Sequence, residues 1–246
     1  MPSVTKSQAI VLHLTRQGDS GAVLHVIDSL AGRQGVYVRG LGKARGASAS
    51  AFHSLALLDI VTYAVPKSSL LYLREYEPIV TMDGIRTDIS KSTTALFISE
   101  VLYRSLKSDD GDTELWKWLA QSIVKLDSAT GSVANFHLWW MTGYCIKAGF
   151  RPNDNWSENA HLFDIVTAQF ISPKDGILRD ERQIFSSEES LLLHLMLNSD
   201  ADKALTLPLR GSLRLSFARR MLDYLSYRFG CDLNVKSLDV LHEIFK

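Results

Sequence analysis

The residues best suited to bind a ligand lie in a stretch without acidic side chains. Residues 29–58 contain no Asp or Glu, although the chain of 246 residues carries 27 basic and 27 acidic residues. Glycines within the stretch let its backbone approach a phosphate chain closely. A flexible polyanion suits such a loop better than a small metabolite. The cations of this stretch are Arg33, Arg39, Lys43 and Arg45, and the glycines are Gly40, Gly42 and Gly46.

Tyrosines share predicted strand faces with some of these cations. Side chains alternate along a strand, so every second residue points to the same face. Bases stack on tyrosine rings and phosphates bind arginine, which together form a surface for single strands. The outward rows are Arg33, Tyr37 and Arg39 on one strand and Tyr72, Arg74 and Tyr76 on another. We therefore predict a DNA site formed by Arg33, Tyr37, Arg39, Lys43, Arg45, Tyr72 and Arg74.

Two other interpretations of the basic stretch stay open. It can be a solvated hairpin with ordinary surface charges, since charge runs are usually solvated. It can also belong to a protein–protein adaptor whose barrel binds a protein rather than DNA. A nucleotide-binding loop is excluded, because the chain has no Walker A sequence and its glycine spacing misses the dinucleotide motif.

An enzyme is not expected. The seven histidines are scattered and show no His-Glu-x-x-His spacing, and no Gly-x-Ser-x-Gly elbow occurs. The basic region also lacks the clustered carboxylates with which a nuclease would hold metal. We predict no catalytic residues. His137 and His194, on largely apolar helices, are expected to be satisfied core residues.

The elements that carry the basic stretch are short strands. Alternating apolar residues and turn signals predict five strands within the first 78 residues. Strands at this spacing indicate a small closed barrel such as an OB-fold, with an SH3-like barrel as the rival. The predicted strands cover residues 10–15, 22–27, 36–39, 55–64 and 70–77.

Beyond residue 78 the apolar period becomes helical. Helices are predicted to end near residues 106, 126, 148, 197, 229 and 244, with Asp88 or Ser90 capping the first and a capping box at Ser186. The fold class is therefore α+β: an OB-fold domain at 1–78 followed by an all-helical domain at 79–246.

Bulk properties indicate a globular cytoplasmic protein. Hydrophobic residues make up 46% and charged residues 22%, and no run approaches the ~20 apolar residues of a membrane span. The first eight residues lack the apolar centre of a signal peptide. The two cysteines, Cys145 and Cys231, are expected to be reduced.

The order of parts resembles the RecO family of bacterial recombination mediators. The resemblance covers nearly the whole chain, although its individual motifs are short. The matching pieces are Ala-Ile-Val-Leu at 9–12, Gly-Asp-Ser at 18–20, the basic loop at 35–45, the strand at 70–77, Tyr-Arg-Phe-Gly at 227–230 and Lys-Ser-Leu at 236–238.

The resemblance implies a non-enzymatic role in DNA repair and recombination in the bacterial cytoplasm, at the nucleoid. Proteins of this family bind single- and double-stranded DNA and anneal complementary strands. In the RecFOR pathway they act with RecR, engage the single-stranded DNA-binding protein (SSB) and help to load the recombinase RecA. These partners are expectations for the present chain.

The chain departs from the family pattern at one place. Many members carry a four-cysteine zinc site in the helical half, which corresponds here to about residues 150–182. That stretch contains no cysteine, and His161 alone cannot supply the four ligands of a structural zinc. We predict no zinc and no other cofactor. The segment is expected to persist as a hairpin held by Trp156, Phe163 and Phe170.

A partner site is predicted on the last long helix. Arg214 falls inside its apolar arc, and an unpaired guanidinium there would be costly to bury. It must reach water, pair internally or meet a partner's carboxylate. SSB proteins end in an acidic tail with an apolar C-terminus, so Arg210 and Arg214 are the candidates for binding it.

Overall fold

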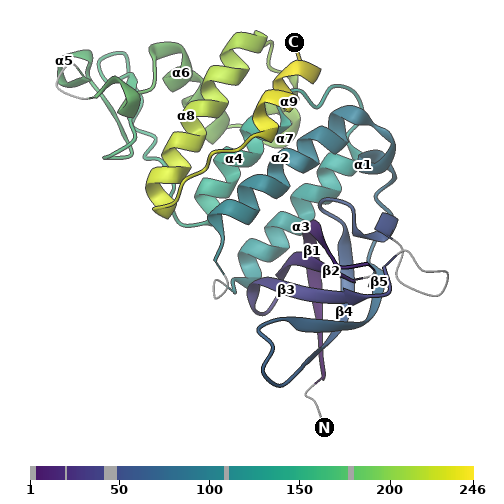
Figure 1. Cartoon of the computed structure of the whole chain (residues 1–246). Helices are drawn as coiled ribbons and strands as arrows, with labels where there is room; N and C mark the ends of the chain where they lie inside the picture. Colours follow the sequence, from purple (N-terminus) through teal and green to yellow (C-terminus); the bar gives the residue numbers. More distant parts are fainter. Residues whose placement is uncertain (1–3, 20, 42–48, 108–110, 177–179) are drawn as a thin grey trace. The chain divides into compact units, whose positions relative to one another are not determined.

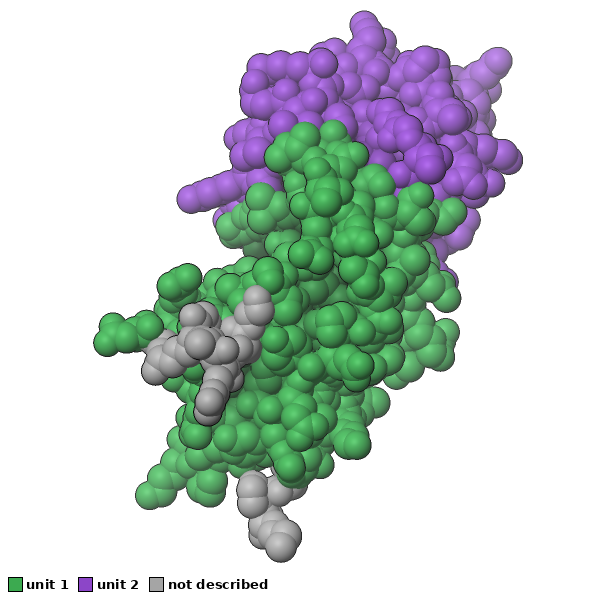
Figure 2. Space-filling view, turned by 90° about the vertical axis from the view of Figure 1, so that its right-hand side faces the viewer, with its two compact units in different colours: residues 1–128 green, residues 129–246 purple. Residues whose placement is uncertain are grey.

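The computed structural model describes residues 4–19, 21–41, 49–107, 111–176 and 180–246 (Figure 1). The chain forms two compact units, residues 1–128 and 129–246, which Figure 2 distinguishes by colour. The change from strands to helices falls at Pro78, where the fifth strand ends, whereas the compact units divide after Ser128. The domain ranges 1–78 and 79–246 stay a prediction.

A closed barrel of five strands forms the first part of unit 1. The strand order around it is β1-β2-β3-β5-β4, and every neighbouring pair is antiparallel except β3 and β5. This confirms the predicted five-stranded barrel with OB-fold strand order. The strands are β1 Val4–Gln17, β2 Gly21–Asp28, β3 Gly32–Arg39, β4 Leu57–Ala64 and β5 Leu71–Pro78.

Alternating side chains fill the barrel. Val36 and Val38 are buried inside it, as the pattern of β3 predicts. Leu24 and Val26 on β2 and Leu58 and Ile60 on β4 point inward in the same way. The intervening residues of these strands therefore face outward, and they form the wall described below.

A bulge on β5 changes which residues of that strand face outward. Thr62 pairs with Leu73 but its neighbour Val61 pairs with Glu75, so Arg74 is an extra residue. Beyond the bulge the alternation is reversed, and Tyr76 packs on the core with its ring 4.9 Å from that of Phe52. The prediction that Tyr76 shares an outward row with Tyr72 and Arg74 was wrong for this reason.

Three helices complete unit 1: α1 Asp83–Thr87, α2 Ile89–Ser105 and α3 Thr113–Ser128, with a short 3₁₀ turn at Ala49–Phe52. Asp88 caps α2 by accepting hydrogen bonds from the backbone N–H groups of Ser90 and Lys91, as predicted. Trp116 on α3 donates to Ile27 O at 3.1 Å, and Ser99 on α2 donates to Leu12 O. These bonds fasten the two helices to the barrel.

Unit 2 is mostly helical and contains the hairpin β6–β7. The capping box at Ser186 and Glu189 is formed, and Gly230 ends α8 in the left-handed conformation at φ 61°. Both features match the sequence analysis. The elements are α4 Phe136–Lys147, β6 Leu162–Asp164, β7 Gln169–Ile171, α5 Pro173–Gly176, a 3₁₀ turn at Glu181–Gln183, α6 Ser187–Leu197, α7 Ala201–Thr206, α8 Gly211–Phe229 and α9 Ser237–Ile244.

Two of the three aromatic residues expected to hold the hairpin, Phe163 and Phe170, lie on β6 and β7. The ring of Phe163 lies 5.3 Å from Phe170 and 5.4 Å from Tyr224 of α8. Trp156 instead stacks on His194 of α6, with the ring centroids 5.1 Å apart.

None of the helices in the described ranges is long and apolar enough to cross a membrane.

Candidate nucleic-acid interface

Three tyrosines form a continuous row across the outside of the barrel. Tyr37 of β3 is the register partner of Tyr72 of β5, and Tyr72 is in turn the partner of Tyr63 of β4. The ring centroids are 5.1 Å apart between Tyr37 and Tyr72 and 5.6 Å apart between Tyr72 and Tyr63. All three are half-buried. We call Tyr37, Tyr63 and Tyr72 the tyrosine row.

Arg39 places a cation on this row. Its guanidinium carbon lies 5.0 Å from the centre of the Tyr72 ring, a distance at which the ring attracts the charge. Arg39 is exposed at the end of β3. A guanidinium held over a ring in this way can still donate its N–H groups to a phosphate.

Gly21 sets the position of Tyr37. The tyrosine lies across β2 so closely that a Cβ on Gly21 would overlap the phenol oxygen. Because only glycine leaves room for the Tyr37 ring there, Gly21 allows the tyrosine row to form although it has no side chain that could contact a ligand.

Tyr63 and the nearby Lys67 were not among the residues predicted from the sequence. Tyr63 continues the outward alternation of Asp59 and Val61 on β4, so the period-two pattern could have identified it. Lys67 is exposed in the turn that joins β4 to β5 and has a φ of 67°. In OB-folds this connection commonly contacts the bound strand.

Arg33 shares the outward side of β3 but is bonded elsewhere. Its Nη1 donates to Tyr103 O of α2 at 2.7 Å, and its guanidinium carbon lies 4.8 Å from the Tyr103 ring. The structure therefore does not bring Arg33 together with Arg39. The side chain joins the barrel to α2, and this contact occupies part of its hydrogen-bonding capacity.

Two histidines adjoin Arg33. His13 and His25 stack with their centroids 4.3 Å apart, and Tyr103 meets both rings edge-on. Burial lowers the pKa of each imidazole below its usual value, and the charge of Arg33 lowers it further. The pair is therefore neutral at pH 7 and acts as a packing element.

The remaining predicted DNA residues are spread over other positions. Arg74 occupies the bulge of β5 and forms an ion pair with Glu75 at 3.2 Å, with both side chains largely exposed. Lys43 and Arg45 lie outside the described residues. Of the seven predicted residues, the structure thus gathers Tyr37, Arg39 and Tyr72 at one place.

The arginines predicted for the partner site are both engaged within unit 2. Arg210 Nη2 binds the two carboxylate oxygens of Glu188 at 3.0 and 2.8 Å. Arg214 donates to Leu209 O at 2.6 Å and to Phe245 O at 2.5 Å, and partial burial lowers its pKa. These bonds are the internal pairing that the sequence analysis left as one option for Arg214.

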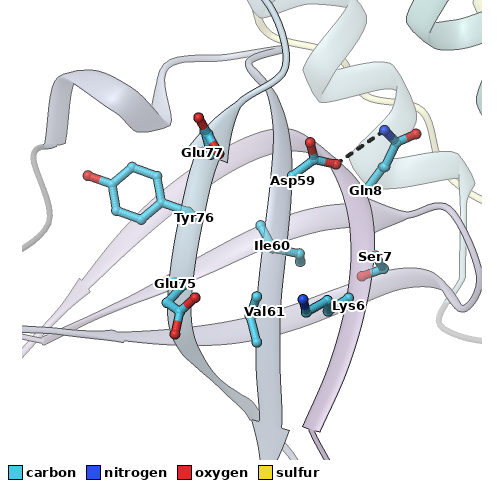
Figure 3. A pocket seen from close by; sticks show the side chains of 9 residues that line it. All are labelled: Lys6, Ser7, Gln8, Asp59, Ile60, Val61, Glu75, Tyr76 and Glu77. Atoms are coloured by element: carbon cyan, nitrogen blue, oxygen red, sulfur yellow. Dashed lines mark hydrogen bonds between the residues drawn. The ribbon is translucent and has the colours of Figure 1, made fainter.

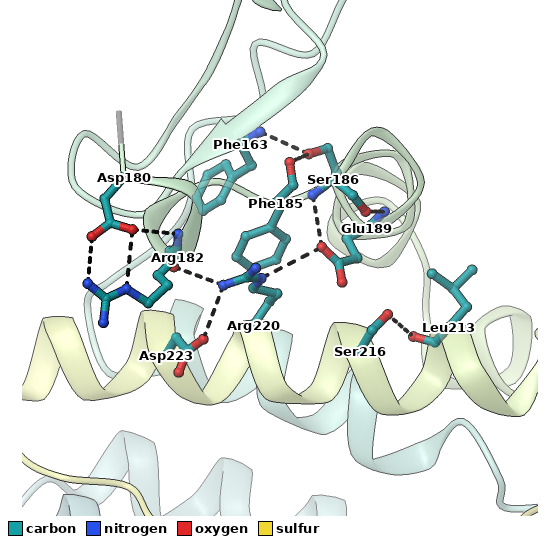
Figure 4. A network of polar contacts seen from close by, with 11 residues as sticks. Phe163, Asp180, Arg182, Phe185, Ser186, Glu189, Leu213, Ser216, Arg220 and Asp223 are labelled. Carbon is teal, nitrogen blue, oxygen red and sulfur yellow. Dashed lines mark hydrogen bonds and ion pairs between the residues drawn. The ribbon is translucent and has the colours of Figure 1, made fainter. Parts of the chain in front are cut away.

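A groove of about 710 Å³ lies beside these arginines. Arg220 is one of its lining residues. Figure 4 shows the polar contacts of Arg220, which donates to Arg182 O at 3.0 Å and faces Asp223 at 3.6 Å and Glu189 at 3.9 Å. Leu215 supplies apolar surface. The lining residues are Glu189, Gly211, Ser212, Leu215, Ser216, Arg219, Arg220, Asp223, His242 and Lys246.

The family's zinc site does not fit the residues present. Residues 150–182 contain no cysteine, and His161 Nδ1 lies 2.9 Å from Glu158 O. Within the described ranges, no group of three or more His, Cys, Asp or Glu side chains could hold a metal. Cys145 is fully buried in α4, and burial raises the pKa of its thiol.

Hydrogen bonds connect this segment internally and to α8. Asn155 exchanges two hydrogen bonds with the backbone of Phe170, both at 2.9 Å. Arg228 of α8 donates to Ile165 O at 2.9 Å and to Val166 O at 3.2 Å. The hairpin is thus joined to α8 through a guanidinium and an aromatic cluster.

The expectation that two histidines lie in the core is confirmed for His137 but not for His194, whose side chain is 31% exposed. His137 is buried in α4, and desolvation lowers its pKa to about 3. His194 Nδ1 lies 2.6 Å from a carboxylate oxygen of Asp154, whose other oxygen accepts from Asn198 at 2.7 Å. The Asp154–His194 pair stacks on Trp156, and its contacts are those of a structural link.

Comparison with known proteins adds an independent finding. Residues 86–236 match a family model described as "Recombination protein O C terminal". The chain is 29% identical over 246 residues to the DNA repair protein RecO of Bacteroides fragilis, with 98% of each chain covered. It is 28% identical to that of Porphyromonas gingivalis, covering 97% of this chain and 98% of the relative, and 25% identical to that of Flavobacterium psychrophilum, covering 98% of both.

Proposed function

Because the chain belongs to the RecO family of DNA repair and recombination proteins, which are generally non-catalytic mediators, we propose that it binds a single DNA strand on the tyrosine row. The observation that supports this most directly is Arg39, exposed over the Tyr72 ring. Stacking of bases on tyrosines and contact of phosphates with arginine tolerate any sequence. A mediator needs such tolerance, because it acts on whatever strand is exposed.

The finer activities follow from the family and are part of the proposal. We expect the protein to bind single- and double-stranded DNA, to anneal complementary strands, and to help RecR load RecA on strands covered by SSB. Lys43 and Arg45 complete the proposed DNA site, together with Arg33 and Arg74.

The acidic tail of SSB is proposed to bind unit 2 near Arg210 and Arg214. The adjoining groove supports this, since it combines the apolar Leu215 with the cations Arg219 and Lys246. An acidic peptide with an apolar end suits such a lining. Titration of a labelled tail peptide should show weaker binding to Arg210→Ala and to Arg219→Ala than to Arg104→Ala, a control in α2.

The test of the DNA site is fluorescence anisotropy of a labelled single strand at several salt concentrations. If Arg39 neutralises one phosphate, Arg39→Ala should reduce the slope of log affinity against log salt by about 0.7. Arg182→Ala is the matched control, because Arg182 is exposed on unit 2. Equal slopes for all three proteins would place the DNA elsewhere and favour the protein adaptor.

The four-residue variant Arg33/Arg39/Lys43/Arg45→Ala extends this test. A slope near −3 for the intact protein, about −0.7 for each of four phosphates, should flatten in this variant. Arg33→Ala alone must be measured beside it for thermal unfolding, since Arg33 also holds α2. A variant that retains its fold and the full slope would contradict the proposed site.

A further inference from the structure

The outer wall of the barrel changes its charge within a few residues of the tyrosine row. Three rungs of register partners cross the wall on β1, β4 and β5. The first is Val4, Tyr63 and Tyr72; the second is Lys6, Val61 and Glu75; the third is Gln8, Asp59 and Glu77. Figure 3 shows the second and third rungs side by side on the three strands.

The two charged residues of the third rung, Asp59 and Glu77, are both acidic. Asp59 accepts a hydrogen bond from Gln8 Nε2 at 3.2 Å, and both Asp59 and Glu77 are exposed. In the described part of the chain, neither carboxylate has an ion-pair partner. We call Asp59 and Glu77 the acidic rung.

The second rung is different because its charges oppose each other. Lys6 and Glu75 flank Val61, and Glu75 also pairs with Arg74 at 3.2 Å. The wall thus passes from tyrosines, through a mixed rung, to two unpaired carboxylates. A groove of about 630 Å³ crosses the mixed and acidic rungs, so both are open to a ligand.

We propose that Asp59 and Glu77 are specificity-determining residues, which make the barrel wall prefer a single strand to a duplex. This rests on the proposed function, because it requires DNA on the tyrosine row. The acidic rung acts by repelling the second backbone of a duplex. Discrimination between two ligands often depends on such a repulsive element as well as on attractive contacts.

Distances along the strands support this assignment. Tyr63 and Asp59 are four residues apart on β4, and at about 3.3 Å per residue they are separated by roughly 13 Å. The Debye length is about 8 Å at physiological ionic strength, so the carboxylates are largely screened from a strand on the tyrosine row. A single strand should therefore be little affected by them.

A duplex carries its second backbone toward the acidic rung. When the first backbone lies on the tyrosines and the duplex extends over β1, β4 and β5, the second backbone lies about 12 Å away across the wide groove, close to the roughly 13 Å that separates the acidic rung from the tyrosine row. Phosphates would then come close to Asp59 and Glu77, where screening is weak. Double-stranded DNA, which the family implies as a ligand, is therefore expected to bind this wall less tightly than a single strand does.

The experiment compares the affinities of a single strand and of a duplex of equal length by anisotropy at physiological ionic strength, where the Debye length is about 8 Å. Asp59→Asn/Glu77→Gln should strengthen duplex binding about three- to tenfold, because two repulsive contacts are removed, and change single-strand binding less than about twofold. The control Glu114→Gln/Glu158→Gln removes the same net charge from exposed positions on helix α3 and in unit 2. Both substitutions are isosteric, and thermal unfolding verifies the fold.

Three outcomes would overturn the inference: equal gains for both ligands, no gain for the duplex, or an equal duplex gain in the control. The Arg39→Ala background separates this failure from failure of the proposed function. If the duplex gain persists unchanged without Arg39, the duplex is bound away from the tyrosine row and the inference is wrong. If Arg39→Ala leaves single-strand binding unchanged, the proposed DNA site itself is wrong.

Discussion

Arg39 on the barrel differs from Arg210 and Arg214 at the start of α8 in how many of its guanidinium N–H groups are already hydrogen-bonded within the protein. Arg39 contacts the face of Tyr72 and keeps its N–H groups exposed. Arg214 donates to two backbone carbonyls, and Arg210 binds Glu188 through both carboxylate oxygens. A cation stacked on a ring remains able to bind an anion, whereas a cation bonded to carbonyls serves the fold.

The sharpest test of this contrast is at the centre of the tyrosine row. Tyr72→Ala removes the ring that contacts Tyr37, Tyr63 and Arg39, and base–aromatic stacking contributes about 1–3 kcal/mol per base. Single-strand affinity, measured by anisotropy, should therefore fall about five- to 150-fold. Tyr227→Ala is the control, since Tyr227 is an exposed tyrosine of unit 2. Equal losses in the two variants would refute a localised stacking surface.

Substitution of Arg214 in α8 should lower the stability of the protein without changing its affinity for DNA. Arg214→Leu breaks the bonds to Leu209 O and Phe245 O, and hydrogen bonds from charged groups contribute about 1.5–3 kcal/mol. We expect a loss of about 2 kcal/mol in the free energy of unfolding. That corresponds to a decrease in Tm of about 4–8 °C for a chain of this size.

Arg210→Ala is the comparison at the N-cap of the same helix. Its pair with Glu188 is largely exposed on both sides, and such pairs contribute about 0–1 kcal/mol. Thermal unfolding of the two variants, with hydrogen exchange of α9, measures the difference. A smaller loss for Arg214→Leu than for Arg210→Ala would show that the carbonyl bonds do not hold the C-terminal end.

Acidification should lower the free energy of unfolding of both unit 1 and unit 2, because each contains histidines whose pKa is lowered in the folded state. Histidines whose pKa is lowered by folding stay neutral in the native state while the unfolded chain takes up protons below pH 6.5. The contribution of these histidines to the free energy of unfolding is therefore fully present above pH 6.5. It decreases as the pH falls toward the pKa of each histidine in the folded state, which is about 3 for His137. The residues are His13, His25 and His53 in unit 1 and His137 in unit 2.

Denaturant unfolding between pH 7 and pH 5 tests this sign. The fully buried His137 contributes up to about 1.4 kcal/mol per pH unit below pH 6.5, and the partly exposed His13, His25 and His53 contribute less because solvent screens them. His13→Gln/His25→Gln should flatten the pH dependence of unit 1 and leave that of unit 2 unchanged. Stability that rises on acidification of the intact protein would contradict the lowered pKa values.

The smallest expected effect is that of metal removal. Because the hairpin β6–β7 is joined to α8 by Arg228 and packed around Phe163, EDTA should change neither Tm nor proteolysis of residues 150–182. Elemental analysis of the purified protein should find less than stoichiometric zinc. Bound zinc that resists dialysis, or loss of the hairpin on chelation, would refute the prediction that the chain dispenses with the family's metal.

Local patterns predicted the elements well and the availability of side chains poorly. The period of 3.6 residues located α2 and α8, and the alternation of β3 placed Val36 and Val38 inside the barrel. The bulge at Arg74 could not be predicted, because it depends on the register between β4 and β5. The same limit applies to Arg33, whose partner Tyr103 O lies 70 residues away in the sequence.

The join between β3 and β5 has a consequence for the order of folding. It consists of two register pairs, Val36 with Leu71 and Tyr37 with Tyr72, whereas the antiparallel ladders beside it are much longer. Its partners are also distant in sequence, so its formation carries a large loop-closure cost. We expect this seam to close last and open first. A DNA strand lying on both Tyr37 and Tyr72 would cross the β3–β5 pair. Bound DNA would therefore slow the opening of the barrel at this pair.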